Sequence, residues 1–222
     1  MTGLAAQKRS TGLALGQSTA KRAIDISFSL PLLVILGPLL LLLCLLVRAT
    51  SAGPALFRQE RLGLDMRPFT IFKLRTMYAN NDDQIHREYM AQMLSDDQLE
   101  PGQSGLFKLD SDPRVTPLGR WLRRSSLDEL PQLLNVLRGD MSIVGPRPVL
   151  PWEARLFGVA YQPRFQMKPG ITGLWQVSGR SRLSIRQALE FDVEYVLRHS
   201  IVLDLIIILR TVPAVLRGGG AR

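Results

Sequence analysis

"ISFSLPLLVILGPLLLLLCLLV" occupies residues 26–47, a run of 22 positions without a charged side chain. As a straight helix it would be about 33 Å long at ~1.5 Å per residue, enough to cross the ~30 Å hydrocarbon core of a bilayer. A cleaved signal peptide normally has a shorter apolar region, and the "RATSAGPA" that follows is a poor cleavage site. The run therefore predicts a membrane segment that stays in the protein.

Prolines and flanking charges decide how this segment sits in a membrane. Pro31 and Pro38 lie inside it and Gly37 precedes the second proline, so the helix has a place to bend. Basic residues flank both ends: Lys8, Arg9, Lys21 and Arg22 before the run, and Arg48, Arg58, Arg61 and Arg67 after it. The positive-inside rule therefore gives no orientation. From these residues alone, the segment either spans the membrane or bends back at Gly37-Pro38.

Composition leaves several classes of partner open. The net charge of +9 is compatible with nucleic acid, an anionic membrane surface or phosphorylated substrates. Cys44 is the only cysteine, so the chain has no internal disulfide framework, which fits a reducing compartment. For 222 residues we expect one domain with appendages. The expected parts are a mobile tail (1–20), a membrane segment (21–48), a core (49–200) and a C-terminal interfacial helix and tail (201–222).

The patterns in the core predict a helix-rich α+β fold. Residues 54–77 read as two strands around a central turn. Residues 80–105 predict one amphipathic helix and then a Pro-Gly loop, and residues 184–200 predict a further helix. Residues 201–222 are apolar but interrupted by charges, which predicts a helix at the interface or under the core. His86 is expected to be solvated on a surface helix, and no Cys or His cluster has metal-ligand spacing.

"SSLDELPQLLNVLRGDMSIVGPRP" (residues 125–148) places two adjacent acids, Asp128 and Glu129, among basic residues. Ser126 with Glu129 three positions later matches a capping box, so one interpretation is a pair of acids that complements a helix dipole. Pro131 complicates a cap at Ser126, because its missing N–H would fall past the first turn. A cap at Asp128 would place that proline safely in the first turn.

The other interpretation of the acid pair is a phosphate site. Asp128, Gln132 and Asn135 share one side of the following helix, so a polar stripe leads away from the carboxylates. An acid pair can bind Mg²⁺ through oxygen ligands, and a carboxylate can attack phosphorus. Arg147, between two prolines in "GPRP", would be held on a stiff turn and could bind phosphate oxygens. The functional interpretation gains weight because the acid pair, the fixed arginine, the glycine turns and the membrane segment occur in one short chain.

The order of several motifs makes the chain resemble the monotopic phosphoglycosyl transferases, bacterial sugar transferases that start exopolysaccharide, capsule, O-antigen or glycoprotein glycan assembly. The resemblance runs from Lys21 to the C-terminus and rests on "KRAID", "FRQERLG", "PFTIFKLRTM", "DPRVTPLGRWLRRSSLDELPQLLNVLRGDMSIVGPRP", "KPGITGLWQVSGR" and "DVEYV". It implies transfer of a sugar-1-phosphate from a UDP-sugar to undecaprenyl phosphate, with release of UMP. It also implies a covalent phosphosugar-aspartate intermediate and Mg²⁺ as cofactor.

The resemblance assigns roles motif by motif. It implies that Asp128 is the catalytic nucleophile, and that Glu129 is a Mg²⁺ ligand with Asp128 beside it. The implied phosphate contacts are Arg123, Arg147 and Arg180. Three further residues lie in matching segments without an assigned role: Lys73, Arg75 and Asp192.

The resemblance also bears on topology. The first helix of the family is re-entrant and breaks at a Ser-Pro pair. Here Gly37-Pro38 stands in its place, so the proline is kept without the serine side chain. We therefore expect a monotopic α+β protein of the small, core-only form. Its re-entrant helix would lie in the bacterial inner (cytoplasmic) membrane, with the catalytic core facing the cytoplasm.

Two other classes of function are alternatives. A membrane-anchored nucleic-acid-binding protein would need a recognisable reading module, which this sequence lacks, so we expect no nucleic acid partner. A non-catalytic scaffold of a polysaccharide assembly complex would not need an acid pair. The expected partners are a UDP-sugar, undecaprenyl phosphate and inner-membrane lipid, and an oligomer is compatible with the sequence. No residue identifies the sugar.

Overall fold

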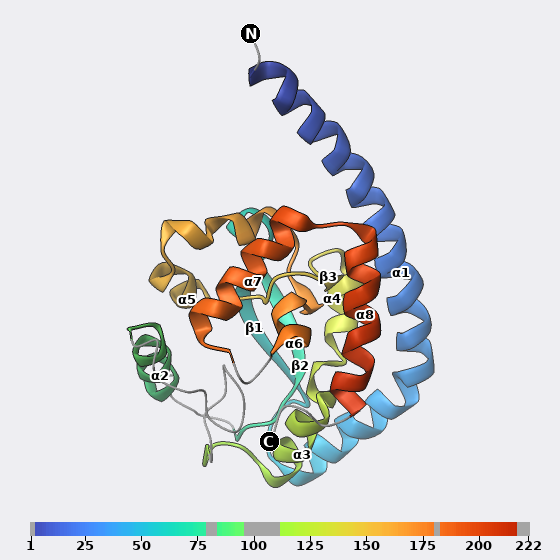
Figure 1. The fold of residues 1–222 in the computed structure, drawn as a ribbon. Helices are drawn as coiled ribbons and strands as arrows, with labels where there is room; N and C mark the ends of the chain where they lie inside the picture. The colour runs from blue at the N-terminus through green and yellow to red at the C-terminus, as the bar shows by residue number, and fades with distance from the viewer. Residues whose placement is uncertain (1–2, 79–83, 96–111, 180–182, 217–222) are drawn as a thin grey trace.

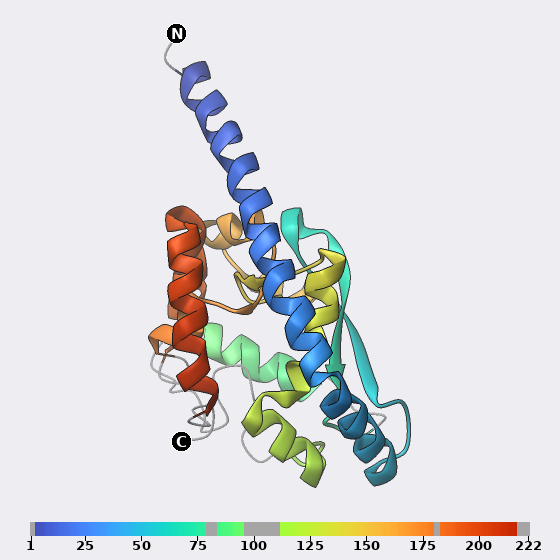
Figure 2. The same ribbon diagram turned by 90° about the vertical axis from the view of Figure 1, so that its right-hand side faces the viewer.

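Helix α1, which runs from Gly3 to Thr50, is the longest element of the computed structural model. Figures 1 and 2 show its N-terminal part projecting from the body of the protein and its second half bending beneath that body. Pro31 and Pro38 lie inside the helix, and each removes a backbone donor, which accounts for a bend. Residues 3–20, which the sequence predicted as a tail, are part of this helix.

The described backbone comprises residues 3–78, 84–95, 112–179 and 183–216. Side chains are described over residues 19–78, 87–93, 112–179 and 183–214.

The stretch Thr19–Thr50 of α1 contains 18 consecutive residues with a mean hydropathy of 3.0, and by length and composition the helix is apolar enough to cross a membrane. Many of its large apolar side chains are exposed, among them Val34 at 68% and Ile35 at 72%. An apolar surface of this extent is unfavourable in water and suits contact with lipid. The predicted apolar segment is therefore present as a helix, and it indicates association with a membrane.

The body of the protein is helix-rich α+β, as predicted. Strand β1 (Leu56–Leu62) pairs antiparallel with β2 (Pro68–Leu74) across the short 3₁₀ helix η1 (Leu64–Met66), where the sequence predicted two strands and a turn. Strand β3 (Ser142–Val144) pairs in parallel with β4 (Gly170–Thr172). The sequence did not predict this second pair, because three-residue strands are too short to show an alternating pattern.

The remaining elements are helical, and most of the connections between them are short. They are α2 (Gln84–Ser95), α3 (Pro117–Ser125), η2 (Leu127–Glu129), α4 (Gln132–Arg138), α5 (Pro151–Leu156), η3 (Val159–Gln166), α6 (Leu174–Ser178), α7 (Ile185–Arg198) and α8 (Ile201–Leu216). The predicted helices within residues 80–105, 184–200 and 201–222 are thus confirmed as α2, α7 and α8. The Pro-Gly loop predicted after α2 lies outside the described residues.

Two glycines allow the parallel strand pair to form. A Cβ added to Gly170 would lie 2.1 Å from the Gly145 nitrogen, and one added to Gly145 would lie 2.3 Å from the Lys168 carbonyl oxygen. Only residues without a side chain permit such an approach. The pair therefore fixes the "GPRP" turn, which follows β3, against the segment that leads into β4.

Both ends of the apolar part of α1 are buried in the same body. At the first end, Lys21 and Asp25 are 8% and 3% exposed. At the second end, Leu43 and Val47 are 2% and 1% exposed and pack with Leu122 of α3, among other residues. Asp25 accepts hydrogen bonds from the Ser142 hydroxyl and the Ile143 N–H at 2.8 and 2.9 Å, which ties α1 to β3. The exposed middle of the helix therefore lies between two anchored ends.

Candidate active site

The acid pair lies on the 3₁₀ turn η2, between two helices. Ser126 ends α3 in the left-handed conformation, with φ of 59°, and its N–H donates to the Arg123 carbonyl. Ser126 is both the C-cap of α3 and the N-cap of η2, but its side chain makes no capping hydrogen bond, so its interpretation as the first residue of a capping box is wrong. Pro131 is the N-cap of α4, so its missing N–H falls where a helix leaves donors unpaired in any case. The turn presents Asp128 and Glu129 side by side.

The two carboxylates have different environments. Asp128 is buried, at 5% exposure. The Glu129 side chain is 28% exposed, and Lys73 Nζ donates to its Oε1 at 2.8 Å. Lys73 comes from β2, which packs against η2. One acid is therefore enclosed by the protein, while the other remains accessible and faces a cation.

Arg123, on the last turn of α3, adds positive charge that acts on Asp128 through space. Burial lowers the pKa of its guanidinium below the usual value, and the charges of Asp128 and Asp112 oppose that shift. Its Nε donates to the Thr76 hydroxyl at 3.0 Å, which fixes the side chain. A guanidinium held in this position can stabilise a carboxylate or the phosphate of a ligand.

A cavity of about 330 Å³ adjoins the acid pair. Its wall includes Glu129 of η2, Leu32 and Leu36 of α1, Thr172 of β4 and Thr211 of α8. The two threonine hydroxyls are hydrogen-bonded to each other at 2.8 Å. Most of the other lining residues are apolar. The site therefore places a carboxylate on a largely apolar cavity that borders the membrane helix.

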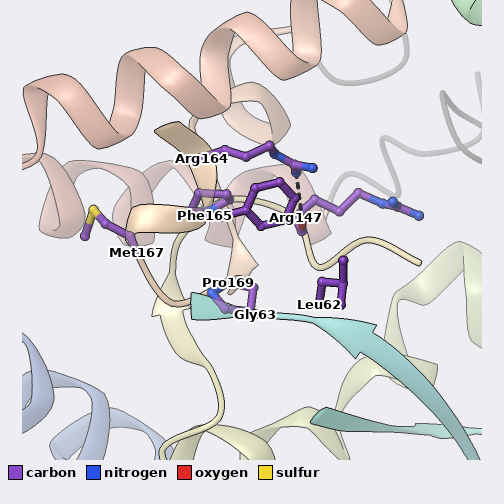
Figure 3. Close-up of a pocket in the computed structure, with 8 residues that line it drawn as sticks. Leu62, Gly63, Arg147, Arg164, Phe165, Met167 and Pro169 are labelled. Carbon is purple, nitrogen blue, oxygen red and sulfur yellow. Dashed lines mark hydrogen bonds between the residues drawn. The ribbon is translucent and has the colours of Figure 1, made fainter. Parts of the chain in front are cut away.

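Arg147 belongs to a second charged cluster. Its Nη1 is 3.4 Å from Glu153 Oε2, and its N–H donates to Asp192 Oδ2 at 3.3 Å. Arg164 donates to the Arg147 carbonyl at 2.8 Å and to Asp192 at 2.5 Å. Burial raises the pKa of the Asp192 carboxyl, and the charge and hydrogen bond of Arg164 oppose that shift. Figure 3 shows Arg147 and Arg164 at a small cavity of about 10 Å³, which has room for roughly one water molecule.

The structure brings together four of the residues singled out in the sequence: Lys73, Arg123, Asp128 and Glu129. Arg147 contacts the second cluster instead, and Arg180 lies outside the described residues. Arg75 has a structural contact, since its Nη2 donates to the Ser51 carbonyl at 2.7 Å and so holds the chain just after α1. Asp192, left without a role by the sequence, is part of the Arg147 cluster.

The polar stripe of α4 is mainly structural. Gln132 and Asn135 are 2% and 0% exposed. Asn135 Oδ1 accepts from the Phe72 N–H at 3.0 Å, and its Nδ2 donates to the Thr70 carbonyl at 2.7 Å. These bonds join α4 to β2. The expectation that the whole stripe leads from the carboxylates is therefore corrected for Asn135.

Sequence reasoning missed Glu153 and Arg164. Glu153 lies between Trp152 and Ala154 on a six-residue helix, too short for a periodic pattern. Arg164 follows a proline and looks like one of many surface cations. The only local signal was a charge in an apolar setting, which is weak without knowledge of its partners.

The acid pair fits a Mg²⁺ ion shared with a substrate. Within the described residues, no group of three or more His, Cys, Asp or Glu side chains is arranged to hold a metal. Mg²⁺, however, is usually bound by one or two carboxylates together with substrate phosphates and waters. Asp128 and Glu129 are adjacent oxygen donors, and Glu129 reaches the cavity. The donor set therefore suits Mg²⁺ at a phosphate substrate rather than a metal held by protein alone.

These features define a membrane-associated α+β protein with a carboxylate pair set among cations. The family model described as bacterial sugar transferase matches residues 16–218. The chain belongs to the bacterial sugar transferase family.

Three relatives illustrate the range of the family. The chain is 39% identical over 202 residues to the exopolysaccharide production protein ExoY of Sinorhizobium fredii, covering 91% of this chain and 88% of the relative. It is 43% identical over 206 residues to the UDP-glucose:undecaprenyl-phosphate glucose-1-phosphate transferase of Caulobacter vibrioides, covering 88% and 69%. It is 39% identical over 202 residues to the undecaprenyl-phosphate galactose phosphotransferase of Salmonella typhimurium, covering 90% of this chain but 41% of that relative.

Proposed function

We propose that this protein transfers a sugar-1-phosphate from a UDP-sugar to undecaprenyl phosphate and releases UMP. The observation that carries the proposal is the acid pair, with Glu129 on a largely apolar cavity that Leu32 and Leu36 of α1 border. A polyprenyl acceptor needs an apolar path from the membrane, and a diphosphate donor needs cations. The names of the Caulobacter and Salmonella relatives support this reaction. It would start the assembly of an exopolysaccharide, capsule, O-antigen or glycoprotein glycan.

The proposed mechanism has two displacements at phosphorus. In the first, a carboxylate oxygen of Asp128 forms a bond to the sugar-bearing phosphorus, and the bond to the bridging oxygen breaks, so that UMP leaves with the electron pair. In the second, a phosphate oxygen of the acceptor attacks the same phosphorus and the Asp128 carboxylate leaves. The two substrates come from water and from lipid, and splitting the reaction means that they need not occupy the site together.

We also propose that Glu129 and Asp128 hold Mg²⁺ when a donor binds. The ion would neutralise charge on the diphosphate and stabilise the leaving UMP. Lys73, which is 2.8 Å from Glu129, orients that carboxylate at the cavity wall.

Arginines would stabilise the phosphate charge that develops during both steps. Arg123 is the first candidate, because its charge acts on Asp128 and its side chain is fixed by Thr76. Arg147 and Arg180 are proposed from their motifs, and Arg147 is additionally supported by its fixed position.

For the membrane helix we propose a re-entrant arrangement with the catalytic core on the cytoplasmic side of the inner membrane. The support is that Lys21 and Asp25 at one end, and Leu43 and Val47 at the other, are all buried in the same body. A straight helix over residues 26–47 would carry its ends about 33 Å apart. A bend at Gly37-Pro38 allows both ends to return to one side.

Labelling of single cysteines tests this topology on a Cys44→Ala background. Cysteines placed in residues 3–20 and at exposed Glu60 on β1 should both react only when reagent reaches the cytoplasmic side. Periplasmic labelling of the N-terminal position, with cytoplasmic labelling at position 60, would show that the helix spans.

A UMP-release assay tests the reaction itself. The full chain in detergent or nanodiscs is mixed with undecaprenyl phosphate, Mg²⁺ and, in turn, UDP-glucose, UDP-galactose or UDP-GlcNAc. We expect UMP release with at least one donor. Without acceptor, we expect up to one equivalent of UMP and a mass increase of one sugar phosphate, both absent in Asp128→Asn. UMP release that strictly requires acceptor, with no adduct, would favour a single displacement. No UMP with any UDP-sugar would contradict the proposed donor and support a scaffold.

A further inference from the structure

Buried charged side chains hold Arg147 at three points. Its backbone N–H donates to Asp192 Oδ2 at 3.3 Å, and its carbonyl accepts from Arg164 Nη2 at 2.8 Å. Its Nη1 lies 3.4 Å from Glu153 Oε2. Glu153 is 0% exposed, and Arg164 and Asp192 are each 2% exposed. Both the backbone and the guanidinium of Arg147 are therefore fixed from inside the protein.

The side chains that hold Arg147 are themselves fixed. Glu153 Oε2 also accepts from the Leu150 N–H at 2.7 Å. The Arg164 guanidinium lies 5.3 Å from the ring centre of Phe157 and 5.5 Å from that of Phe165. Groups bonded and packed on several sides adjust little to their neighbours. They therefore set the position of Arg147 rather than follow it.

Among the described residues, the cluster holds more cations than anions. Arg61 Nη1 also lies 3.5 Å from Glu153 Oε2, so in this part of the chain three guanidinium groups face the two carboxylates of Glu153 and Asp192. The Arg147 side chain is the most exposed of the three cations, at 20% against 12% for Arg61 and 2% for Arg164. The excess charge is therefore most accessible at Arg147, where an anion would meet it.

A turn does not need this many buried charges to keep its shape. The prolines on both sides of Arg147 already restrict the backbone, and apolar side chains would fill the same volume without desolvating ions. What the charges add is a guanidinium with a fixed direction. A fixed group loses less side-chain entropy when it binds a ligand, so it binds more tightly.

We propose that Glu153, Arg164 and Asp192 are positioning residues that preset Arg147 to hold a phosphate of the nucleotide donor. Arg164 and Asp192 fix the backbone of Arg147, and Glu153 directs its guanidinium. This inference rests on the proposed function, because it takes the donor to be a UDP-sugar.

A double-mutant cycle on UDP binding tests the inference. UDP carries the diphosphate without a transferable sugar phosphate, so its affinity for the full chain in detergent with Mg²⁺ can be measured by calorimetry. Arg147→Ala should weaken UDP binding about 10- to 100-fold, as expected for a lost charged hydrogen bond. Glu153→Gln should weaken it by roughly 5- to 30-fold. The double variant should bind no more weakly than Arg147→Ala alone, because Glu153 acts through Arg147.

A purely structural role would give a different result. If the effects of Glu153→Gln and Arg147→Ala multiply, Glu153 does not act through Arg147 and the inference is overturned. Ser184→Ala is the matched control, because it removes the N-cap of α7, the helix that carries Asp192. It should lower the unfolding temperature without changing UDP affinity.

A second variant keeps the test decisive if Glu153→Gln does not fold. Asp192→Asn keeps the shape of the side chain and removes its charge, and it enters the same cycle with the same expectation. Additive effects of Asp192→Asn and Arg147→Ala would again overturn the inference. Failure of the unaltered chain to bind UDP would overturn the proposed donor, and this inference with it. That outcome differs from UDP binding with additive effects, which overturns the inference alone.

Discussion

Two charged groups next to α1 are built in opposite ways. The first group lies at the base of α1, by which we mean the turn that carries Lys21 and Asp25, where the apolar part of the helix begins. Lys21 Nζ donates to the Val144 carbonyl at 2.8 Å, to the Tyr195 hydroxyl at 3.2 Å and to Asp204 Oδ2 at 2.8 Å. An ammonium has three donors, so every one is used inside the protein. Lys21 is 8% exposed and Asp204 1% exposed.

Glu129 of the η2 acid pair is arranged for contact with a ligand, unlike its buried neighbour Asp128. Glu129 accepts from Lys73 at 2.8 Å, keeps 28% of its side chain exposed and lines the large cavity. A carboxylate has about four acceptor sites, and the exposed part of Glu129 on the cavity wall can meet a ligand or a metal ion. Charges saturated inside the protein, such as Lys21, therefore fix the fold, whereas a part-exposed carboxylate on a cavity wall, such as Glu129, can act on ligands.

The largest expected effect is at Asp128. Asp128→Asn removes the attacking charge and almost no volume, so we expect activity to fall by at least about a thousand-fold. The unfolding temperature should change little. Turnover by UMP release and thermal unfolding of the same preparation check both parts. If Asp128→Asn keeps most of its activity, Asp128 is not the nucleophile. The contrast between the Lys21 network and the acid pair would then not hold.

A substitution at Lys21 should show the reverse pattern, with its main effect on stability. Lys21→Met leaves Asp204 buried without its ammonium, so we expect a loss of about 3–5 kcal/mol in the free energy of unfolding. Arg48→Met, which changes an exposed cation just after the buried second end of α1, is the matched control and should stay within about 0.5 kcal/mol. Denaturant unfolding in micelles measures both. Equal stabilities of the two variants would mean that the saturated network contributes nothing special.

Glu129 should act through metal rather than through stability. Glu129→Gln is expected to raise the Mg²⁺ concentration for half-maximal activity by about ten-fold or more. A Mg²⁺ titration of turnover measures this, with Glu60→Gln, an exposed carboxyl on β1, as the control. An unchanged Mg²⁺ requirement in Glu129→Gln would exclude Glu129 from the metal site.

The smallest expected effect is a loss of stability in acid. Burial alone would raise the pKa of the Asp204 carboxyl, but hydrogen bonds from His199, Lys21 and Tyr195, and the charge of Lys21, bring it below the usual value. A depressed pKa contributes stability above the unfolded-state value of about 3.9, and this is lost as pH falls through the folded-state value. Below about pH 4 the unfolding temperature should fall by a few degrees more in the unaltered chain than in Asp204→Asn. Identical pH profiles would contradict the assignment.

What the sequence could predict depended on the range of the interaction. The β1–β2 pair and α7 were predictable because strand alternation and helical patterns are local signals in the sequence. Asp204 was interpreted as an interruption of an apolar helix, because its partner Lys21 is 183 residues away in the chain. The left-handed Ser126 gave no signal either, since a serine before an acidic turn is typical of a helix start. The conformation follows from the end of α3.

The candidate site likewise combines features that could be predicted from the sequence with features that could not. Asp128, Glu129 and Arg123 could be predicted because they are close in the sequence and match a motif. The cavity could not, because its wall combines α1, η2, β4 and α8. Glu153 was likewise invisible, since its role depends on Arg61 and Arg147, which other segments supply.

The anchoring of α1 has a consequence for biosynthesis. The bonds at its base join Asp25 to Ser142, 117 residues later, and Lys21 to Asp204, 183 residues later. At roughly 5–20 residues per second, the ribosome makes α8 about 10–40 seconds after the base of α1. During that interval Lys21 is a hydrated cation beside a helix already in contact with lipid. It becomes buried only when α8 is made, so α1 is locked in place only after residues 201–216 have been translated.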